Sequence, residues 1–453
     1  MPNVPRSFET GEVAKGEGAP GEGEPDDATR GRAWAAGVTA AAILGFSLAW
    51  VALMWLIDHQ IYGNPLSAVD VGVFRRVAEQ LVAGAVPYRD FDLEYPPLAL
   101  IPIWLPVLLG GDPSSAASYR AAFIVVEAAF GMLITILVMR TVTALERGRR
   151  DVIVAAAMVA ATPLLLGPLM LSRYDLWPAL FAAAATWLLV IDRPRWAAVA
   201  VGLGVLAKVY PVVLAPFAIA YLWRTWGRRE AILFGLVMAV VVLAGLAPFF
   251  LVAPEGIVDA LTRAFRRPIQ VESIGAAFLY LREVMTGEAV RVVHTFDSYN
   301  LRGALAEQVG TLMSVVLGTA LAIALGLFVR GRPTLDRLVL AVAAALAAWV
   351  AFGRVLSPQY MIWLIAPLAV VASRRWSLSL VALVVAILLT GLYYPRFYNA
   401  YYSHREVEWV VVVLGRDLVL VALAGYLLAL LRDRGPALPA GAPPGEGTGP
   451  VPA

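Results

Sequence analysis

Acidic side chains recur at every second position in one polar stretch near the start of the chain. Asp90, Asp92 and Glu94 alternate there with apolar residues. In an extended backbone, residues at this spacing lie on one side of the chain, so the three carboxylates could bind sugar hydroxyls, a metal ion or only water. Tyr95 follows them and precedes two prolines, which end the extended segment. The stretch therefore predicts a polar binding surface.

A fourth carboxylate, Asp70, begins an amphipathic helical pattern. The apolar residues Phe74, Val77 and Leu81 follow it at helical spacing, so all four lie on one face of the expected helix. Such a pattern is typical of a helix lying at a membrane interface. Asp70 could then cap this helix, or act as a general base that takes a proton from a hydroxyl group.

Composition places these residues in a membrane protein. Of the 453 residues, 60% are hydrophobic and 15% are charged, and the mean hydropathy is +0.74, which is beyond ordinary soluble domains. The net charge of +3 gives no reason to expect a nucleic-acid partner, because the arginines lie in short clusters between apolar runs. The chain has no cysteine, so disulfides and thiolate metal sites are excluded.

Apolar segments of about the length that crosses a bilayer recur along the chain. Twelve are expected, at 34–57, 115–142, 152–171, 174–191, 196–208, 211–223, 230–252, 303–329, 335–353, 358–372, 376–394 and 408–431. The predicted fold is an all-α polytopic bundle of about twelve transmembrane helices, with an interfacial helix in the first outer loop. The segment 98–110 is too short to cross and is expected to be re-entrant or interfacial.

Arginine clusters set the expected orientation. With twelve spans, the clusters at 146–150, 192–195, 224–229, 330–333, 373–375 and 432–434 all fall on one side. Basic short loops face the cytoplasm, so both chain ends are expected there. The first loop (58–97) and the long loop (254–302) then lie outside, on a membrane domain of residues 34–433. The ends, 1–33 and 434–453, are rich in Gly and Pro and are expected to be disordered.

More polar residues fall on the predicted outer side. The candidates to hold an anionic phosphate are Lys208, Arg173, Arg354 and His294. The candidates to bind an acceptor or a sugar are Asp90, Asp92, Glu94, Tyr95, Tyr210, Gln359 and Tyr360. A membrane protein with such groups at the mouth of its bundle could bind an anionic, lipid-anchored substrate.

Each of these residues also has a plainer interpretation. Lys208 could extend from a broken helix to the interface, and Arg173 could pair with Asp175. Arg354 could satisfy backbone groups freed by the break at Pro358. A histidine in an outer loop, such as His294, often has no special role. Both interpretations of these residues, as site residues and as structural ones, therefore remain open.

Charged residues also lie inside apolar spans. Glu127 falls in the middle of one, with Arg120 two turns earlier, and Arg416 and Asp417 interrupt the last one. Intramembrane charges are functional hypotheses by default, but pairing between helices explains them equally well. We assign them to packing.

The polar motifs together resemble a known family. In order they are Asp70-x-x-Val73-Phe74, Gly84, Pro87-Tyr88, Tyr95-Pro96-Pro97-Leu98, GLGVLAKVYPVVLAP (202–216) and LSPQYMIWL (356–364). This series is similar to glycosyltransferase family 87, whose members are integral-membrane enzymes of the GT-C architecture that use polyprenyl-phosphate sugars, notably polyprenyl-phosphate mannose. The resemblance covers about residues 34–430 and implies a catalytic aspartate, which maps to Asp70. Phe74 stands where the family often has tyrosine, a difference that bears on acceptor binding.

The implied reaction needs few protein groups. A sugar carried on a lipid phosphate already has a good leaving group, so one general base can suffice, and Asp70 fits it. A cation must hold the phosphate as its charge grows, and Lys208 fits that role. A lipid monophosphate donor needs no metal ion, so no metal and no cofactor are expected, and the donor acts as co-substrate. The anomeric carbon is expected to invert.

The expected function is transfer of a hexose from polyprenyl phosphate to a glycolipid or glycan acceptor, and mannose is the sugar that the resemblance implies. The site is expected on the extracytoplasmic face of the cell membrane, and the expected partners are the bilayer, the donor and the acceptor. An arabinofuranosyltransferase on the same scaffold is the alternative within this class. A lipid-linked sugar transporter or flippase is the alternative without chemistry, and its charged groups should lie along a path through the bilayer.

Overall fold

The computed structural model describes residues 27–61, 69–372 and 378–432. The α-helices are α1 (Asp27–Asp58), α2 (Val69–Val82), α3 (Leu100–Leu108), α4 (Ala116–Ala144), α5 (Arg149–Leu166), α6 (Leu169–Ser172), α7 (Leu176–Val190), α8 (Pro194–Ala207), α9 (Leu214–Thr225), α10 (Arg228–Val252), α11 (Pro254–Arg266), α12 (Ile274–Thr286), α13 (Ala304–Arg330), α14 (Leu335–Phe352), α15 (Met361–Ala372), α16 (Leu378–Tyr393) and α17 (Val407–Arg432). Short helical turns are η2 (Pro97–Ala99), η3 (Tyr210–Val213), η4 (Pro358–Tyr360) and η5 (Ala400–His404). The strands are β1 (Ile269–Gln270), β2 (Arg291–Thr295) and β3 (Ser298–Arg302).

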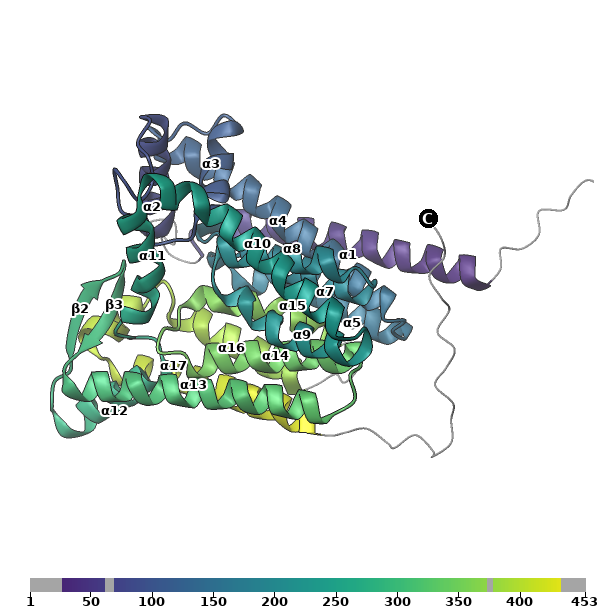
Figure 1. The fold of residues 1–453 in the computed structure, drawn as a ribbon. Helices are drawn as coiled ribbons and strands as arrows, with labels where there is room; N and C mark the ends of the chain where they lie inside the picture. The colour runs from purple at the N-terminus through teal and green to yellow at the C-terminus, as the bar shows by residue number, and fades with distance from the viewer. Residues whose placement is uncertain (1–26, 62–68, 373–377, 433–453) are drawn as a thin grey trace, which may run out of the picture.

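These helices form one elongated bundle (Figure 1). Within the described residues, α1, α4, α10, α13, α14 and α17 are long and apolar enough to cross a membrane. The chain is therefore a membrane-embedded, predominantly α-helical protein, as predicted. Each of the twelve predicted spans coincides with a helix or a pair of helices, but several of these are shorter than a full crossing. The number of twelve crossings stays a prediction.

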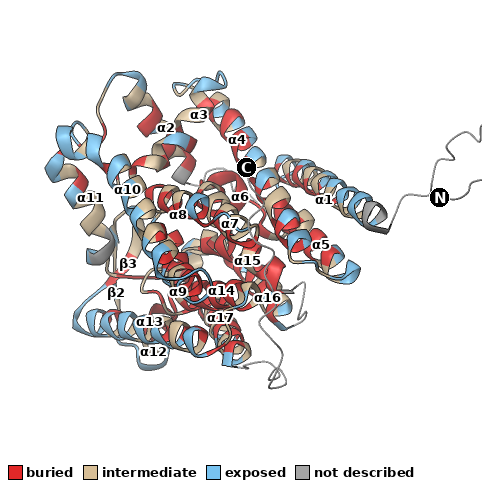
Figure 2. Ribbon diagram, turned by 45° about the vertical axis from the view of Figure 1, so that its right-hand side comes forward, coloured by how far each residue is buried: buried red, intermediate tan, exposed pale blue. Residues whose placement is uncertain are grey.

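The core of the bundle is built from α14 and α15. The stretch 341–351 of α14 carries many alanines, and almost all of its residues are buried. Small side chains let membrane helices approach each other closely, which explains why this helix lies at the centre. Figure 2 shows α14 and α15 as the buried interior, whereas α1 and α13 expose much of their length.

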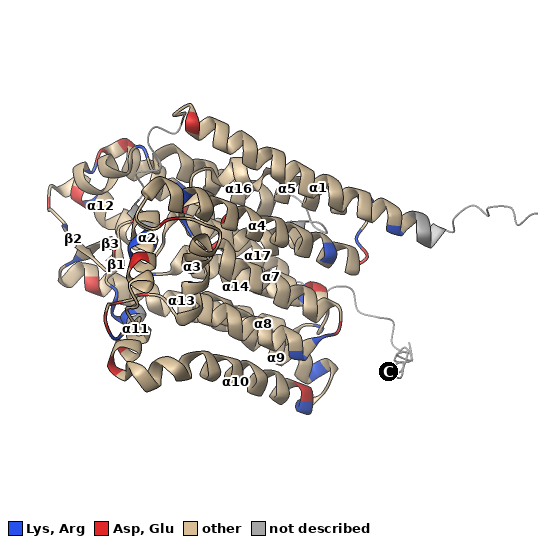
Figure 3. Ribbon diagram, turned by 90° about the horizontal axis from the view of Figure 1, so that it is seen from above, with Lys and Arg blue, Asp and Glu red and all other residues tan. Residues whose placement is uncertain are grey.

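The loops at one end of the bundle contain most of the arginine clusters of the short loops, and we call this the basic end. Three polar contacts join its loops: Arg147 with Asp336, Arg195 with Glu230, and Arg224 with the carbonyl oxygen of Gly331. The predicted grouping of these clusters on one side therefore holds for the described loops. Figure 3 shows that charged residues gather toward the helix ends, while the helix middles are mostly uncharged. Which end faces the cytoplasm stays a prediction.

The opposite end is covered by folded segments. The predicted long loop contains α11, β1, α12, β2 and β3, and the three strands form an antiparallel sheet in the order β1-β3-β2. This small sheet is the one departure from an all-α fold in the described residues. The segment 98–110 forms the end of η2 and the nine-residue helix α3, and its expected re-entrant or interfacial position stays a prediction.

Two predictions need correction, one on where the first helix begins and one on the conformation of the first loop. The first helix begins at Asp27, although residues 1–33 were expected to be disordered, because hydrophobicity marks only the apolar part of a helix that can extend beyond it. Residues 1–26 and 433–453 lie outside the described chain, and so do 373–377 with their arginines. The expected extended segment is interrupted at 87–91, where the chain turns back on itself at Tyr88, whose φ is 66° and whose N–H bonds to the carbonyl of Phe91.

Candidate functional site

The site lies where short helices end inside the bundle, before the ends of the longer helices beside them. α8 has 14 residues and α10 has 25, and their first turns are joined at the basic end by Arg195 and Glu230. At 1.5 Å per residue, α8 ends about 16 Å short of the far end of α10. Lys208 follows α8 directly in an extended conformation. The side chain of Lys208 therefore starts inside the bundle and not at its end.

Lys208 meets Asp175 and Trp363 at this level. The Lys208 Nζ lies 2.7 Å from Asp175 Oδ1, and the indole N–H of Trp363 donates to the same oxygen, also at 2.7 Å. Asp175 stands at the start of α7 but makes no capping bond there, so its carboxylate is available to both partners. Asp175 and Trp363 were not among the predicted site residues, because their contact joins positions 188 apart in the sequence.

Aromatic rings surround this pair, and we call the whole group, formed by residues 173–175, 208–210 and 360–363, the platform. Trp363 is sandwiched between Tyr210, at 4.0 Å between ring centroids, and Tyr360, at 3.8 Å. The Lys208 ammonium lies 5.2–5.6 Å from the rings of Tyr174, Tyr360 and Trp363. These distances allow cation–π attraction, so the platform holds a cation in a fixed place.

Other cations approach the same region. Arg173 donates to the hydroxyl of Tyr394 at 2.8 Å. Arg267, which the sequence analysis did not single out, donates to the Ser298 hydroxyl at 2.9 Å. Its charge opposes the rise that burial causes in the pKa of Glu94. The signal that could have found Arg267 is the Arg-Arg-Pro sequence at 266–268, where the chain enters β1.

The predicted acidic row is split in the structure. Asp90 is exposed and pairs with its neighbour Arg89 at 2.8 Å. Asp92 and Glu94 instead approach Arg263 of α11, at 2.8 and 3.8 Å. The prediction of three carboxylates on one side is therefore wrong, because the turn at 86–91 rotates the chain. Within the described residues, no group of three His, Cys, Asp or Glu side chains could hold a metal ion.

Asp70 is the second residue of α2, and its side chain lies outside the described part of the chain. The helix forms where predicted, and its apolar face packs on the protein. Phe74, one turn after Asp70, makes ring contacts with Tyr95 at 6.1 Å and Tyr174 at 5.4 Å. Tyr174 in turn lies beside Lys208. This face of α2 is thus directed toward the platform.

The remaining predicted residues lie at different distances from the platform. Tyr95 stacks edge-on against Tyr174 at 5.2 Å. The guanidinium of Arg354 is packed on α13, where its Nη2 would be 2.8 Å from a Cβ at Gly310. Gln359 has a buried Oε1 without a hydrogen-bond partner in the described chain.

His294 is exposed on β2 and contacts the ring of Tyr299 at 5.0 Å. Among the described contacts, none joins it to Lys208, Arg173 or Arg354. The structure therefore does not bring His294 to the other predicted phosphate ligands.

A second buried polar cluster lies beside the site. Glu272, in the segment between β1 and α12, accepts a bond from the Tyr393 hydroxyl at 2.8 Å, and Arg416 donates to the Glu272 carbonyl at 2.6 Å. Burial raises the pKa of Glu272 to about 7, although the charge of Arg416 opposes this rise. Arg416 lies 2.8 Å from Asp417 on the same helix and donates to the Tyr393 hydroxyl of α16 at 3.0 Å, so Arg416 joins two helices, as its assignment to packing predicts. Glu272 was missed because its partners lie on distant helices.

Glu127 behaves differently from this cluster. Its side chain is fully buried, and neither carboxyl oxygen has a hydrogen-bond partner in the described chain. The predicted pairing between helices is therefore not seen for this carboxyl group.

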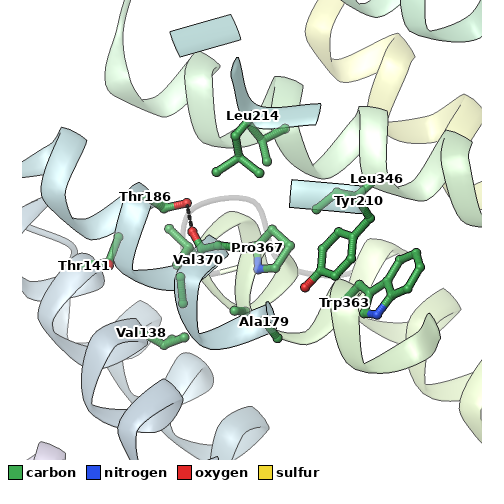
Figure 4. Close-up of a pocket in the computed structure, with 14 residues that line it drawn as sticks. Val138, Thr141, Ala179, Thr186, Tyr210, Leu214, Leu346, Trp363, Pro367 and Val370 are labelled. Carbon is green, nitrogen blue, oxygen red and sulfur yellow. Dashed lines mark hydrogen bonds between the residues drawn. The ribbon is translucent and has the colours of Figure 1, made fainter. Parts of the chain in front are cut away.

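A cavity lies on the basic-end side of the platform. Figure 4 shows Tyr210 and Trp363 at one end of it and Thr141, Thr186 and Val370 further along. It is small, because the space open to a water-sized sphere is about 20 Å³, enough for about one water molecule. The hydroxyls of Thr141 and Thr186 bond to carbonyls of their own helices, so the cavity wall is apolar apart from the Tyr210 hydroxyl, which has no partner in the described chain.

Comparison with known proteins assigns the chain to a family. No curated protein matches it. The family model described as glycosyltransferase family 87 matches residues 93–358, more than half of the chain. The matched region contains most of the platform, including Arg173, Asp175 and Lys208, and begins after Asp70. The chain therefore belongs to glycosyltransferase family 87, and it is a membrane-embedded glycosyltransferase.

Proposed function

We propose that this glycosyltransferase moves a hexose, specifically mannose, from a polyprenyl phosphate to a glycolipid or glycan acceptor. The reaction takes place on the extracytoplasmic face of the cell membrane, and the anomeric carbon inverts. The observation that carries the proposal is the cationic platform, which lies within the depth of a membrane bundle rather than at its surface. A donor with a lipid tail and a phosphate head matches that position.

The charges at the platform indicate which cations together hold the donor phosphate. Lys208 is neutralised by Asp175 at 2.7 Å, so the pair alone adds no net positive charge. Arg173 and Arg267 supply further positive charge nearby, and both are close enough to repel the Lys208 ammonium. We therefore assign the donor phosphate to Lys208 together with Arg173 and Arg267. Its charge grows as the glycosidic bond breaks, and fixed cations stabilise that growth.

Asp70 is the proposed general base. It takes the proton of the acceptor hydroxyl while that oxygen attacks the anomeric carbon, and the lipid phosphate leaves with the bonding electrons. The face of α2 that carries Phe74 is directed to the platform, which supports this role. Glu94 is the second candidate, because burial raises its pKa and a raised pKa suits proton transfer. Neither role requires a metal ion.

The cavity below the platform argues against a flippase. A transporter of a sugar phosphate needs polar groups along its path. The wall between the platform and the basic end offers only Tyr210 as a free hydroxyl in the described chain, because Thr141 and Thr186 are already bonded. This cavity is unsuited to a sugar, which favours the enzyme.

The test is sugar transfer from radiolabelled polyprenyl-phosphate mannose in membranes that contain equal amounts of each protein. We compare the wild type with Asp70→Asn and Glu94→Gln. The matched control is Asp90→Asn, because Asp90 is exposed and its partners, Arg89 and the Val86 N–H, belong to its own turn. We expect transfer by the wild type and the control, and a loss of at least a hundredfold in Asp70→Asn.

The other outcomes are informative as well. If only Glu94→Gln is inactive, Glu94 is the base and Asp70 is a structural residue of α2. If the wild type itself transfers no label from this donor but transfers a pentose from a polyprenyl-phosphate arabinose, the hexose assignment is wrong. If it transfers neither sugar, the polyprenyl-phosphate donor is wrong.

A further inference from the structure

Aromatic side chains form a continuous row from the platform to the outer sheet. The row runs through Tyr394, Tyr398, Tyr402, Tyr299 and His294, with successive ring centroids 5.4, 5.1, 3.7 and 5.0 Å apart. We call it the tyrosine row. At its inner end, the hydroxyl of Tyr394 accepts a hydrogen bond from Arg173 at 2.8 Å. The row is therefore connected to the proposed phosphate site.

Three separate segments build the row. Tyr394 follows α16, and Tyr398 and Tyr402 are four residues apart in the helical turns that lead into η5 and through it, so they share one face. Tyr299 and His294 are direct partners across the β2–β3 pair. Figure 1 shows this sheet at the end of the molecule opposite the basic end, beside the yellow-green segment that leads into α17. The fold thus aligns rings that lie far apart in the sequence.

Partial exposure distinguishes the row from the core beside it. Tyr393 and Tyr401 belong to the same cluster, are fully buried, and use their hydroxyls on Glu272 and on the Val271 carbonyl. The four tyrosines of the row are only half-buried, and His294 is exposed. Part of each ring in the row is therefore accessible from outside the protein, whereas the rings of Tyr393 and Tyr401 are not.

We infer that the tyrosine row binds the glycan part of the acceptor, several sugar units in length, with its growing end at Arg173. This inference rests on the proposed function. The row offers ring faces, hydroxyls and an imidazole but no formal charge, which suits neutral sugar units. Pyranose C–H groups pack on aromatic faces, and sugar hydroxyls bond to phenol and imidazole groups. Tyrosine gives such contact area at a low cost in conformational entropy.

The inference predicts a dependence on acceptor length. A single sugar reaches only the inner end of the row near Tyr394, whereas a longer glycan also contacts Tyr402 and Tyr299. Loss of one stacking ring should weaken binding of the longer glycan about tenfold, which corresponds to about 1.4 kcal/mol. Binding of the single sugar should not change.

The experiment measures binding of octyl glycosides to the full-length protein in lipid nanodiscs. The probes are octyl α-mannoside and the octyl glycoside of a linear α-linked mannotetraose, with the matching glucose series as a second pair. The variants are Tyr402→Leu and Tyr299→Leu. Tyr402→Phe keeps the ring and serves where the leucine variants lose thermal stability. Trp409→Leu is the matched control, because Trp409 stacks on Phe397 in the same outer region at 4.2 Å but outside the row.

We expect the tetrasaccharide to bind more tightly than the single sugar in the wild type and in Trp409→Leu. The difference should shrink about tenfold in both leucine variants and remain in Tyr402→Phe. Equal affinity for short and long probes in the wild type, in both sugar series, would overturn the inference. So would equal weakening by Trp409→Leu. Binding is measured without the donor and therefore does not depend on sugar transfer. If binding depends on probe length but the protein transfers no sugar, the proposed function is contradicted and the inference about the tyrosine row is still supported.

Discussion

The ammonium group of Lys208 and the carboxylate of Asp175 lie 2.7 Å apart, at a level where the bundle is mostly apolar. The side chain of Asp175 is 2% exposed and that of Lys208 is 18% exposed. One oxygen of Asp175 accepts from both Lys208 and Trp363. Asp175 therefore fixes the position of the lysine and of the central ring of the platform at the same time.

Asp175→Asn should destabilise the protein by about 3 kcal/mol, because it leaves the charge of Lys208 without its partner inside the bundle. The measurement is the thermal unfolding midpoint in detergent. In the double variant Asp175→Asn with Lys208→Met, the buried charge is absent, so much of the lost stability should return. If the two single effects simply add, the pair is not coupled and the platform has another basis.

Trp363→Phe tests the second bond to Asp175. Phenylalanine preserves a ring between Tyr210 and Tyr360 but removes the indole N–H. We expect a stability loss of about 1–2 kcal/mol and a fall in transfer of about tenfold, because the carboxylate that holds Lys208 loses a donor. Trp177→Phe is the control, since its indole bonds to the Leu98 carbonyl at 3.1 Å. A similar fall in transfer in that control would contradict the special role of Trp363.

Ala183→Leu and Ala185→Leu test the cavity below the platform. Ala183 lines it, so part of the leucine side chain can enter this space, and the substitution should cost less than about 1 kcal/mol. Ala185 lies on the same helix, is fully buried and is not part of the cavity wall. Leucine there should destabilise by about 1–3 kcal/mol. A smaller fall in the unfolding midpoint for Ala183→Leu than for Ala185→Leu is the expected result, and equal falls would show that side chains cannot enter the cavity.

Arg263→Gln tests how the first outer loop is held. Arg263 contacts Asp92, Glu94 and Asp259. The contacts are partly exposed, so the loss of global stability should stay within about 1 kcal/mol. Backbone hydrogen exchange across residues 86–96 should nevertheless become faster. In Arg266→Gln, exchange in this stretch should be unchanged, because Arg266 contacts Asp259 but neither Asp92 nor Glu94.

Glu272 predicts a pH dependence of stability. The pKa of its carboxyl group is about 7 in the folded protein, compared with an ordinary value of 4.5. The folded state therefore holds this proton more tightly than the unfolded chain does. The stabilisation linked to this proton is complete below pH 4.5 and is lost as the pH rises through 7. One proton accounts for at most about 1.4 kcal/mol per pH unit. Unfolding curves from pH 4 to 8 should show this loss in the wild type but not in Glu272→Gln, and parallel curves would contradict it.

The sequence predicted the helical bundle and several platform residues for a simple physical reason. Apolar runs mark helices, and a polar residue that interrupts such a run has few explanations other than a site or a break. Lys208 and Tyr210 were found in this way, and both lie in the platform. The helix α2 followed from the spacing of its apolar residues. Its Asp70 remains a prediction.

Other residues could not be found from the sequence because their roles depend on tertiary contacts. Trp363 looks like an ordinary aromatic residue of an apolar helix until the fold brings its indole to Asp175. Glu272 likewise gains its meaning from Tyr393 and Arg416 on other helices. The alternating carboxylates were misread because one residue with positive φ, Tyr88, is enough to change the direction of the chain. Spacing patterns describe regular backbone and fail at such turns.

The short length of α8 also determines how far a phosphate bound at Lys208 would enter the electric field of the membrane. Lys208 lies about 16 Å below the end of α10, or about half the thickness of a hydrocarbon layer. With the proposed orientation, a phosphate that reaches Lys208 from outside moves inward through part of the transmembrane potential, toward the negative side. A full crossing is worth about 2.3 kcal/mol per charge at 100 mV, so half of it opposes binding by about 1 kcal/mol. Under the proposed function, donor affinity therefore depends on the membrane potential, and a depolarised membrane favours the loaded enzyme.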